Sequence, residues 1–192
     1  MHKFVRIGVK PLTKTAITPN QITTLRLISG LGAALLFSIG QEGYTIVGSG
    51  IFILSLLLDR ADGILARLTG KTSKFGHKYD LIADTISNAM SFVGIGAGLR
   101  HGQLDDLAII LGFVAGLSVA TVFFLVIRIE ALQGDRSAEI KSTAGFDPDD
   151  GMLIVPVALL FGFGNELIIS AAIGAPIFGI FFFMKFRYLL RT

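Results

Sequence analysis

Long apolar stretches separated by short charged segments constrain this chain more than any other feature. Six stretches can be read from the sequence: residues 20–40, 44–58, 77–100, 107–129, 152–164 and 167–184. An α-helix needs about 20 predominantly apolar residues to cross a hydrocarbon core of ~30 Å. The fifth stretch is short by this measure, so we expect it to begin earlier or to be tilted and shielded by its neighbours. The sequence therefore predicts an all-α membrane protein with six transmembrane helices.

The composition also favours a membrane protein. Hydrophobic residues make up 52% of the 192 residues and charged residues 16%, whereas a soluble domain carries about 25% charged residues. The positive residues behind the net charge of +3 lie between the apolar stretches and not on one stripe, so no nucleic-acid partner is predicted. The length indicates a single membrane domain, residues 1–192. Without cysteine, disulfides and zinc thiolate sites are excluded, and no removable signal peptide is expected.

The distribution of lysine and arginine supports six spans and predicts their orientation. With six spans both termini lie on one side, and every Lys and Arg except Arg100 falls in segments on that side. Cytoplasmic segments carry an excess of these residues. We therefore predict an integral protein of the cell (inner) membrane with both termini in the cytoplasm. Five or seven spans would scatter the charges over both sides.

Residues 1–18 are predicted to form a juxtamembrane segment. Its four positive residues recur every three or four positions with apolar residues between them: Lys3, Arg6, Lys10 and Lys14. This spacing is typical of an amphipathic helix that lies on an anionic leaflet. Alternatively, the charges only hold the amino terminus in the cytoplasm, and the sequence does not decide between the two.

The first span is expected to begin at Thr18-Pro19-Asn20, a helix-start pattern. It contains one charge, Arg26, about a turn and a half inside. At that depth the side chain either reaches back to the membrane interface or faces an anionic ligand.

Two pairs of glycines allow close helix approach in the third and fourth spans. Gly94 and Gly98 lie four residues apart, as do Gly112 and Gly116. Small residues at this spacing occur where membrane helices pack closely. Packing within one chain is the default interpretation, and a homodimer interface is the alternative.

Four aspartates stand around the link between the second and third spans: Asp59, Asp62, Asp80 and Asp84. The first two are three residues apart and the last two are four apart, so on helices each pair shares one face. Because the link is short, the end of one helix must lie beside the start of the next. Tyr44 to Asp59 corresponds to about 22 Å of helix, which places the carboxylates near the inner edge of the hydrocarbon layer.

Four unpaired carboxylates in one small volume would need to be neutralised. Hard divalent cations prefer carboxylate oxygen, and only His77 lies nearby as a softer ligand. Arg67 supplies a planar donor for phosphate, and Gly63 and Ala66 remove bulk beside it. The pattern predicts metal-assisted phosphate chemistry at a membrane boundary. A transporter with an intramembrane cation site is the alternative, although such sites usually lie near the bilayer midplane and often show repeat symmetry, which is absent here.

The spacing D-x2-D-G-x2-A-R-x8-G-x3-D-x3-D is met in full by eight residues: Asp59, Asp62, Gly63, Ala66, Arg67, Gly76, Asp80 and Asp84. It resembles the signature of the CDP-alcohol phosphatidyltransferases. The segment PNQIT, residues 19–23, also resembles the family's entry to its first span. Beyond about Gly98 the resemblance is limited to the number and length of the spans.

This resemblance implies a homodimeric, integral-membrane enzyme of phospholipid biosynthesis with six helices. Such an enzyme transfers a substituted phosphate from a CDP-linked lipid donor, commonly CDP-diacylglycerol, to a small alcohol acceptor and releases CMP. Its partners are then the donor, the acceptor and the lipid bilayer. A transferase with a different CDP-linked donor remains an alternative.

The resemblance also implies residue roles. Asp59, Asp62, Asp80 and Asp84 would bind Mg²⁺ or Mn²⁺, as two divalent cations some ~3.5–4 Å apart that bridge the pyrophosphate. Asp84 would also take the proton of the acceptor's hydroxyl group. The resemblance further implies that the CDP group is held by six other residues: Asn20, Thr23, Gly63, Ala66, Arg67 and Ser73.

The acceptor is not specified by the signature, since the family uses glycerol 3-phosphate, serine, inositol phosphate, choline and others. Four positive residues are candidates for a phosphorylated acceptor or, equally, orientation charges: Arg26, Arg128, Arg136 and Lys141. Residues 146–150, FDPDD, would favour a cationic acceptor if they reached the site, and otherwise form a solvated loop. The sequence favours no single acceptor.

Overall fold

The computed structural model describes residues 2–133 and 148–190, and these residues form helices and turns without a strand. In chain order the elements are α1 (His2–Val9), η1 (Lys10–Lys14), α2 (Pro19–Ile39), α3 (Glu42–Thr69), α4 (Lys74–Gly98), η2 (Leu99–His101), α5 (Asp106–Gln133), η3 (Pro148–Leu153), α6 (Ile154–Leu160), α7 (Gly164–Phe186) and η4 (Arg187–Leu190), where η marks a 3-10 helix. The prediction of an all-α fold is confirmed.

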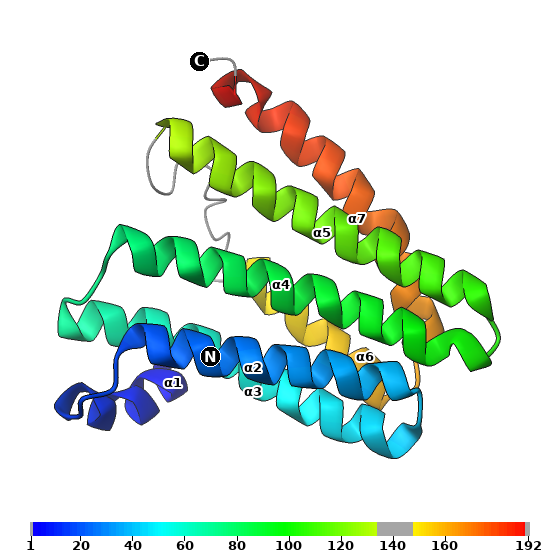
Figure 1. Ribbon diagram of the computed structural model, residues 1–192, viewed down its shortest axis with the longest axis horizontal. Coiled ribbons are helices and arrows are strands. Elements are labelled where there is room, and N and C mark those ends of the chain that lie inside the picture. Colours follow the sequence, from blue (N-terminus) through cyan, green and yellow to red (C-terminus); the bar gives the residue numbers. More distant parts are fainter. Residues whose placement is uncertain (1, 134–147, 191–192) are drawn as a thin grey trace.

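The long helices α2 to α5 run alongside one another, with α7 crossing next to α5 (Figure 1). Helix α2 packs against both α3 and α4, α4 packs against α5, and α6 packs against α3. The turns α2–α3, α4–α5 and α6–α7 gather at one end of the bundle (Figure 1). The opposite end holds α1, the start of α2 and the link between α3 and α4, which is the link that the aspartates flank.

Local sequence explains where these helices begin and end. The Thr18 side chain accepts a hydrogen bond from the Gln21 N–H while the Gln21 side chain accepts one from the Thr18 N–H, which is a capping box that begins α2. The predicted helix start at residues 18–20 is thus confirmed. Helices α2 and α3 end at Gly40 and Gly70, whose left-handed backbone favours glycine. The Ser73 hydroxyl then caps α4 by accepting the Gly76 N–H at 2.9 Å.

Both glycine pairs pack within this chain. A Cβ atom at Gly94 or Gly98 would clash with backbone carbonyl groups of α2, and one at Gly112 or Gly116 would clash with carbonyl groups of α4. The default interpretation of these pairs is therefore confirmed. The close approaches keep α2, α4 and α5 in fixed register around an apolar core that includes Phe52.

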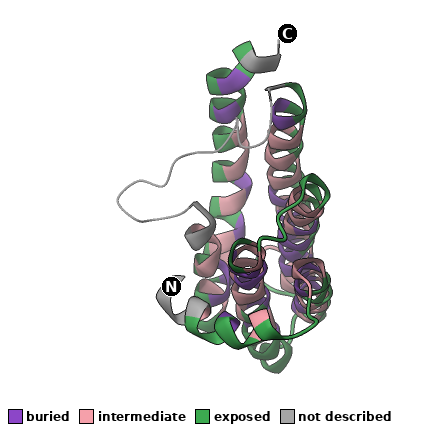
Figure 2. Ribbon diagram, turned by 90° about the vertical axis from the view of Figure 1, so that its left-hand side faces the viewer, coloured by how far each residue is buried: buried purple, intermediate pink, exposed green. Residues whose placement is uncertain are grey.

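Within residues 2–133 and 148–190, three helices are long and apolar enough to cross a membrane: Pro19–Ile39, Asp106–Leu132 and Gly164–Phe186. Figure 2 shows exposed residues on the outward faces of the bundle, and on α5 and α7 many of them are large and apolar, as Phe113 and Ile180 illustrate. Apolar residues on an outer surface of this extent indicate contact with lipid. The chain is therefore an integral membrane protein.

The fifth predicted span differs most from the structure. Residues Ile154–Leu160 form only seven residues of α-helix, which rise about 10 Å and cannot cross the bilayer alone. Gly162, in the left-handed region at φ 79°, makes a turn inside the predicted stretch 152–164, and α7 begins at Gly164, before the expected start of the sixth span at residue 167. Six helices α2 to α7 follow the predicted order, but the count of six spans stays a prediction.

The predicted juxtamembrane segment contains helix α1 and the turn η1. Helix α1 lies against α3, and Val9 is buried with Ile22 and Leu65. Its position on a lipid surface stays a prediction. Arg136, Lys141 and the start of the segment FDPDD lie outside the described residues.

Candidate metal and phosphate site

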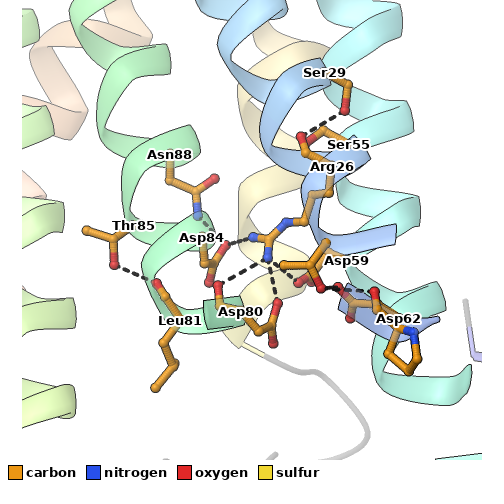
Figure 3. Close-up of polar contacts among 12 residues, drawn as sticks. Arg26, Ser29, Ser55, Asp59, Asp62, Asp80, Leu81, Asp84, Thr85 and Asn88 are labelled. Carbon is orange, nitrogen blue, oxygen red and sulfur yellow. Dashed lines mark hydrogen bonds and ion pairs between the residues drawn. The ribbon is translucent and has the colours of Figure 1, made fainter. Parts of the chain in front are cut away.

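Helices α2, α3 and α4 bring the predicted aspartates together at one end of the bundle. Asp59 and Asp62 come from α3, whereas Asp80 and Asp84 come from α4, on the other side of the short link (Figure 3). Helix α2 lies between these two helices and directs Arg26 toward the acids (Figure 3). The convergence expected from the sequence is thus present.

Three of the four carboxylates share one small volume. Asp59, Asp62 and Asp80 each offer an oxygen atom, and these oxygens lie within 4.8 Å of one another. Asp62 is buried, while Asp59 and Asp80 keep partial exposure. Carboxylate oxygens this close repel one another, and a hard divalent cation is the ligand that best relieves the repulsion. The donor set therefore fits a divalent metal ion.

Asp84 is not part of this group of three. Its Oδ1 accepts a hydrogen bond from Asn88 Nδ2 at 2.9 Å, one turn further along α4, and pairs with Arg26 Nη2. The structure thus distinguishes Asp84 from the other three aspartates, although the sequence pattern treats all four alike.

The Arg26 guanidinium is the centre of the polar network. Nη1 lies 2.9 Å from Asp59 Oδ1 and 2.8 Å from Asp80 Oδ1, and Nη2 pairs with Asp84. The Arg26 side chain is buried, with 1% of the residue exposed, so it does not reach back to the membrane interface, which was the first of the two interpretations. It faces anionic groups, and these belong to the protein itself. Its predicted role toward an acceptor stays a prediction.

Two contacts of the site were missed by reasoning from sequence. Thr23 Oγ1 donates a hydrogen bond to Asp62 Oδ2 at 2.6 Å, and it was predicted to touch the CDP group. Asn88, which holds Asp84, was not predicted at all. The contact between Asn88 and Asp84 could have been predicted, because residues four apart on a helix face one another. The contact between Thr23 and Asp62 joins different helices, so no spacing within the sequence predicts it.

The residues predicted to hold the CDP group lie at the rim of the site. The Asn20 carbonyl oxygen Oδ1 is close to Gly76, since a Cβ atom placed there would lie 3.2 Å from it, and Ser73 Oγ is equally near. Asn20 on α2 therefore meets the start of α4 beside Ser73. Thr24, one turn along α2, contacts the hydroxyl group of Tyr79 at 2.9 Å.

Arg67 and Gly63 form a second part of the rim on α3, where Gly63 directly follows Asp62 and Arg67 lies one turn further on. The Arg67 Nε donates to the Gly63 carbonyl at 3.0 Å, and the side chain is exposed. No neighbour other than this guanidinium lies within 4 Å of a Cβ atom placed at Gly63. An anion can thus approach the backbone there and meet a guanidinium. Ala66 lies beside them, partly buried.

Two other polar residues at this end come from α5. Arg128 is exposed, and no contact in the described residues links it to the aspartates. The carboxylate of buried Glu130 lies 2.9 Å from His77 Nε2 and so connects α5 to α4. His77 thus has a partner of its own and is not part of the group of three carboxylates.

Comparison with known proteins connects this geometry to a family. A family model described as CDP-alcohol phosphatidyltransferase matches residues 16–181. The archaetidylinositol phosphate synthase of Pyrococcus horikoshii is 40% identical over 59% of this chain and 58% of its own length. The CDP-diacylglycerol–glycerol-3-phosphate 3-phosphatidyltransferase of Cereibacter sphaeroides is 32% identical over 77% of this chain and 65% of its own. The chain thus spans less than two thirds of each of these relatives.

A solved structure shares the fold over nearly the whole chain. The phosphatidylinositol phosphate synthase of Mycobacterium tuberculosis with CDP-DAG bound matches with a TM-score of 0.73 at 19% identity, over 99% of this chain and 94% of that one. The same protein in complex with manganese and citrate matches with a TM-score of 0.72 at 19% identity, over 98% and 89%. At this identity the likeness shows the fold alone.

Proposed function

Since this chain belongs to the CDP-alcohol phosphatidyltransferase family, we propose that it transfers a substituted phosphate group from a CDP-linked lipid, most simply CDP-diacylglycerol, to the hydroxyl group of a small acceptor and releases CMP. The observation that carries the proposal is the group of three carboxylates from two helices whose oxygens lie within 4.8 Å. The Arg67 guanidinium and the small residues Gly63 and Ala66 lie beside this group. The whole chain acts as a single membrane domain in this proposal.

Asp59, Asp62 and Asp80 would hold divalent cations, Mg²⁺ or Mn²⁺, with Asp84 completing the set. Two such ions held there would supply positive charge that neutralises the pyrophosphate oxygens and the leaving group. The protein's own contribution is to hold the carboxylates in place. Thr23 does so through Asp62, and the short link between α3 and α4 fixes the two aspartate pairs against each other.

The donor's cytidine diphosphate group would lie along the rim. Arg67 offers a guanidinium to the pyrophosphate, and Gly63 allows the anion to approach the backbone. Asn20 and Ser73, which meet at the start of α4, offer polar groups to the cytidine portion. Asn20 and Thr23 both stand in the segment that resembles the family's entry to its first span, and Thr23 acts through Asp62 in this arrangement.

Asp84 would act as the general base. The acceptor's hydroxyl oxygen forms a bond to the donor phosphorus while its proton passes to the Asp84 carboxylate, and the bond from phosphorus to the CMP oxygen breaks with its electron pair leaving on CMP. Before the reaction the Asp84 carboxylate is held by its contacts with Asn88 and Arg26. They also fix its orientation on α4.

The membrane arrangement of the proposal is six spans with both termini and the site on the cytoplasmic side of the inner membrane. The distribution of Lys and Arg supports this orientation. The lipid chains of the donor would then stay in the bilayer while the soluble acceptor arrives from the cytosol. A homodimer is part of the proposal by resemblance to the family.

The test is metal-dependent release of CMP from CDP-diacylglycerol by purified protein with a panel of acceptors: glycerol 3-phosphate, serine, inositol phosphate and choline. We expect release with one acceptor, loss of release with a chelator and recovery with Mn²⁺ or Mg²⁺. Arg67→Ala should raise the KM for the donor, while Lys71→Ala, at an exposed position just past the end of α3, should not. No release with any CDP-linked donor, together with cation flux in liposomes, would favour a transporter.

A further inference from the structure

Arg26 is buried more completely than a charged side chain at a membrane boundary usually is. It is 1% exposed, and the described part of the chain surrounds it with carboxylates from both α3 and α4. A buried charge is costly unless other charges and hydrogen bonds compensate it. Its contacts therefore indicate a specific purpose for the guanidinium at this position.

The backbone around Arg26 is also fixed. Its carbonyl oxygen accepts hydrogen bonds from Ser29 Oγ at 2.8 Å and from the buried Ser55 Oγ at 3.0 Å (Figure 3). One turn further on, a Cβ atom at Gly30 would lie 2.6 Å from Ser87 Oγ, so α2 is pressed against α4 at this level. Arg26 is thus held between α3 and α4 by packing as well as by charge.

The guanidinium occupies the same carboxylates that would bind metal. Nη1 contacts one oxygen each of Asp59 and Asp80, two members of the group of three carboxylates, and so bridges α3 to α4. A divalent cation shared by these aspartates would bridge the same helices. Arginine and metal ion therefore perform the same bridging task and compete for the same negative charge.

We propose that Arg26 is a positioning residue that serves as an internal counter-cation: it holds the aspartates of α3 and α4 together in the metal-free protein and gives up part of these contacts when the first divalent cation binds. This inference rests on the proposed metal site. It assigns Arg26 to the aspartates and not to the acceptor. It also means that metal binding is an exchange of cations, so the arginine lowers the affinity of the site for metal.

The effect of Arg26 on metal affinity distinguishes a counter-cation from a residue that only supports the fold or binds the acceptor. A unit positive charge about 4 Å from a divalent cation weakens binding by at least about tenfold even at the dielectric constant of bulk water. Removal of Arg26 should thus tighten metal binding while it destabilises the metal-free protein. A residue that only supports the fold would weaken metal binding when removed, and a residue that binds the acceptor would leave it unchanged.

The experiment compares wild type with Arg26→Gln, Arg26→Lys and the control Arg100→Gln, each as full chain in detergent and stripped with a chelator. Arg100 also bridges α2 and α4, but through backbone carbonyl groups at the opposite end. Mn²⁺ alone is the probe, with free Mn²⁺ measured by electron paramagnetic resonance and thermal unfolding midpoints recorded with and without it. The inference requires that Mn²⁺ affinity depends on whether the side chain at position 26 carries a positive charge.

We expect Arg26→Gln to bind Mn²⁺ at least about tenfold more tightly than wild type, with a lower metal-free midpoint and a larger rise on Mn²⁺ addition. Arg26→Lys, which keeps the charge, should stay within about threefold of wild type. Arg100→Gln should lower the midpoint without changing Mn²⁺ affinity. Equal or weaker Mn²⁺ binding by Arg26→Gln overturns the inference. Failure of wild type to bind Mn²⁺ overturns the metal site and this inference together.

A double variant covers the case in which Arg26→Gln does not fold. Arg26→Gln with Asp84→Asn removes one charge of each sign and leaves the group of three carboxylates intact. Because one fewer carboxylate is left without a counter-charge, its metal-free midpoint should lie above that of Arg26→Gln, and it should bind Mn²⁺ at least about tenfold more tightly than the Asp84→Asn single variant. A double variant that stays unfolded, or that binds Mn²⁺ no more tightly, contradicts the counter-cation role.

Discussion

Helices α2 and α4 meet at both of their ends, and each end uses one arginine in a different way. At the end with the aspartates, Arg26 joins the helices through side-chain carboxylates. At the end with the turns, Arg100 on η2, just beyond α4, donates to the carbonyl oxygens of Ser38 and Ala97. Carboxylates can exchange a guanidinium for a metal ion, whereas the neutral carbonyl groups of a last helical turn carry no formal charge to attract one.

The packing of α2 against α4 also differs between the two ends. Near the turns, Gly98 brings α4 against the Phe37 carbonyl group, with no room for a side chain. Near the aspartates, Gly30 packs against the buried hydroxyl groups of Ser55 and Ser87, and Ser55 donates to the Arg26 carbonyl oxygen. Both ends thus use close approach, but only the end with the aspartates also holds buried charge. The comparison indicates that the end of α2 and α4 near the turns contributes mainly to stability, whereas the end near the aspartates also positions the charged groups of the site.

Asp84→Asn should have the largest effect, because it removes the proposed base with little change in shape. We expect CMP release to fall by about 10²–10⁴-fold while the protein still inserts and keeps its unfolding midpoint within about 5 °C of wild type. Asp106→Asn, an exposed aspartate at the end with the turns, is the matched control and should retain full activity. Wild-type turnover in Asp84→Asn would remove Asp84 as the base.

Thr23→Val comes next, since it deletes the hydroxyl group that donates to Asp62 and keeps the side-chain volume. Loss of such a supporting hydrogen bond typically weakens metal binding by about 10–100-fold. Thr24→Val, next to it but on the exposed face of α2, should leave Mn²⁺ affinity unchanged. If Thr23→Val raises only the KM for the CDP-linked donor, Thr23 touches the donor and does not act through Asp62.

The contrast between the two ends also explains what could be read from the sequence. Asp59 and Asp62 lie three residues apart on one helix, so spacing alone predicted a shared face, and the short link to α4 predicted convergence with Asp80. The contact of Arg26 with these acids depends on how α2 rotates between α3 and α4. That rotation is set by the packing of Gly30 and its neighbours, which leaves no pattern within one segment.

The short helix α6 is a second feature that the sequence did not fully predict. Its apolar composition correctly predicted a helix, but Gly162 ends that helix early through its left-handed backbone conformation. A glycine in an apolar stretch is compatible with both close packing and a turn. Only the neighbouring helices decide which applies, as Gly94 and Gly162 illustrate.

Gly98→Ala tests the packing at the end with the turns. A Cβ atom there would clash with the Phe37 carbonyl oxygen, and a backbone atom can yield only by moving α2. We expect a loss of about 1–3 kcal/mol in the free energy of unfolding with unchanged Mn²⁺ affinity in the folded fraction. Gly32→Ala, where a Cβ atom meets nothing within 4 Å, is the control and should be neutral or stabilising by up to ~1 kcal/mol. Weakened Mn²⁺ binding in Gly98→Ala would mean that the two ends are coupled.

Arg100→Gln should have the smallest effect and is the sharpest check on the comparison. The guanidinium lies partly exposed, and it donates hydrogen bonds to the neutral carbonyl oxygens of Ser38 and Ala97, so its loss should cost about 1 kcal/mol of unfolding free energy. Because no carboxylate of the aspartate group lies at that end, Mn²⁺ affinity and CMP release should equal those of wild type. An Arg100→Gln protein that binds Mn²⁺ more tightly would show that buried positive charge anywhere in the bundle, and not Arg26 in particular, opposes metal binding.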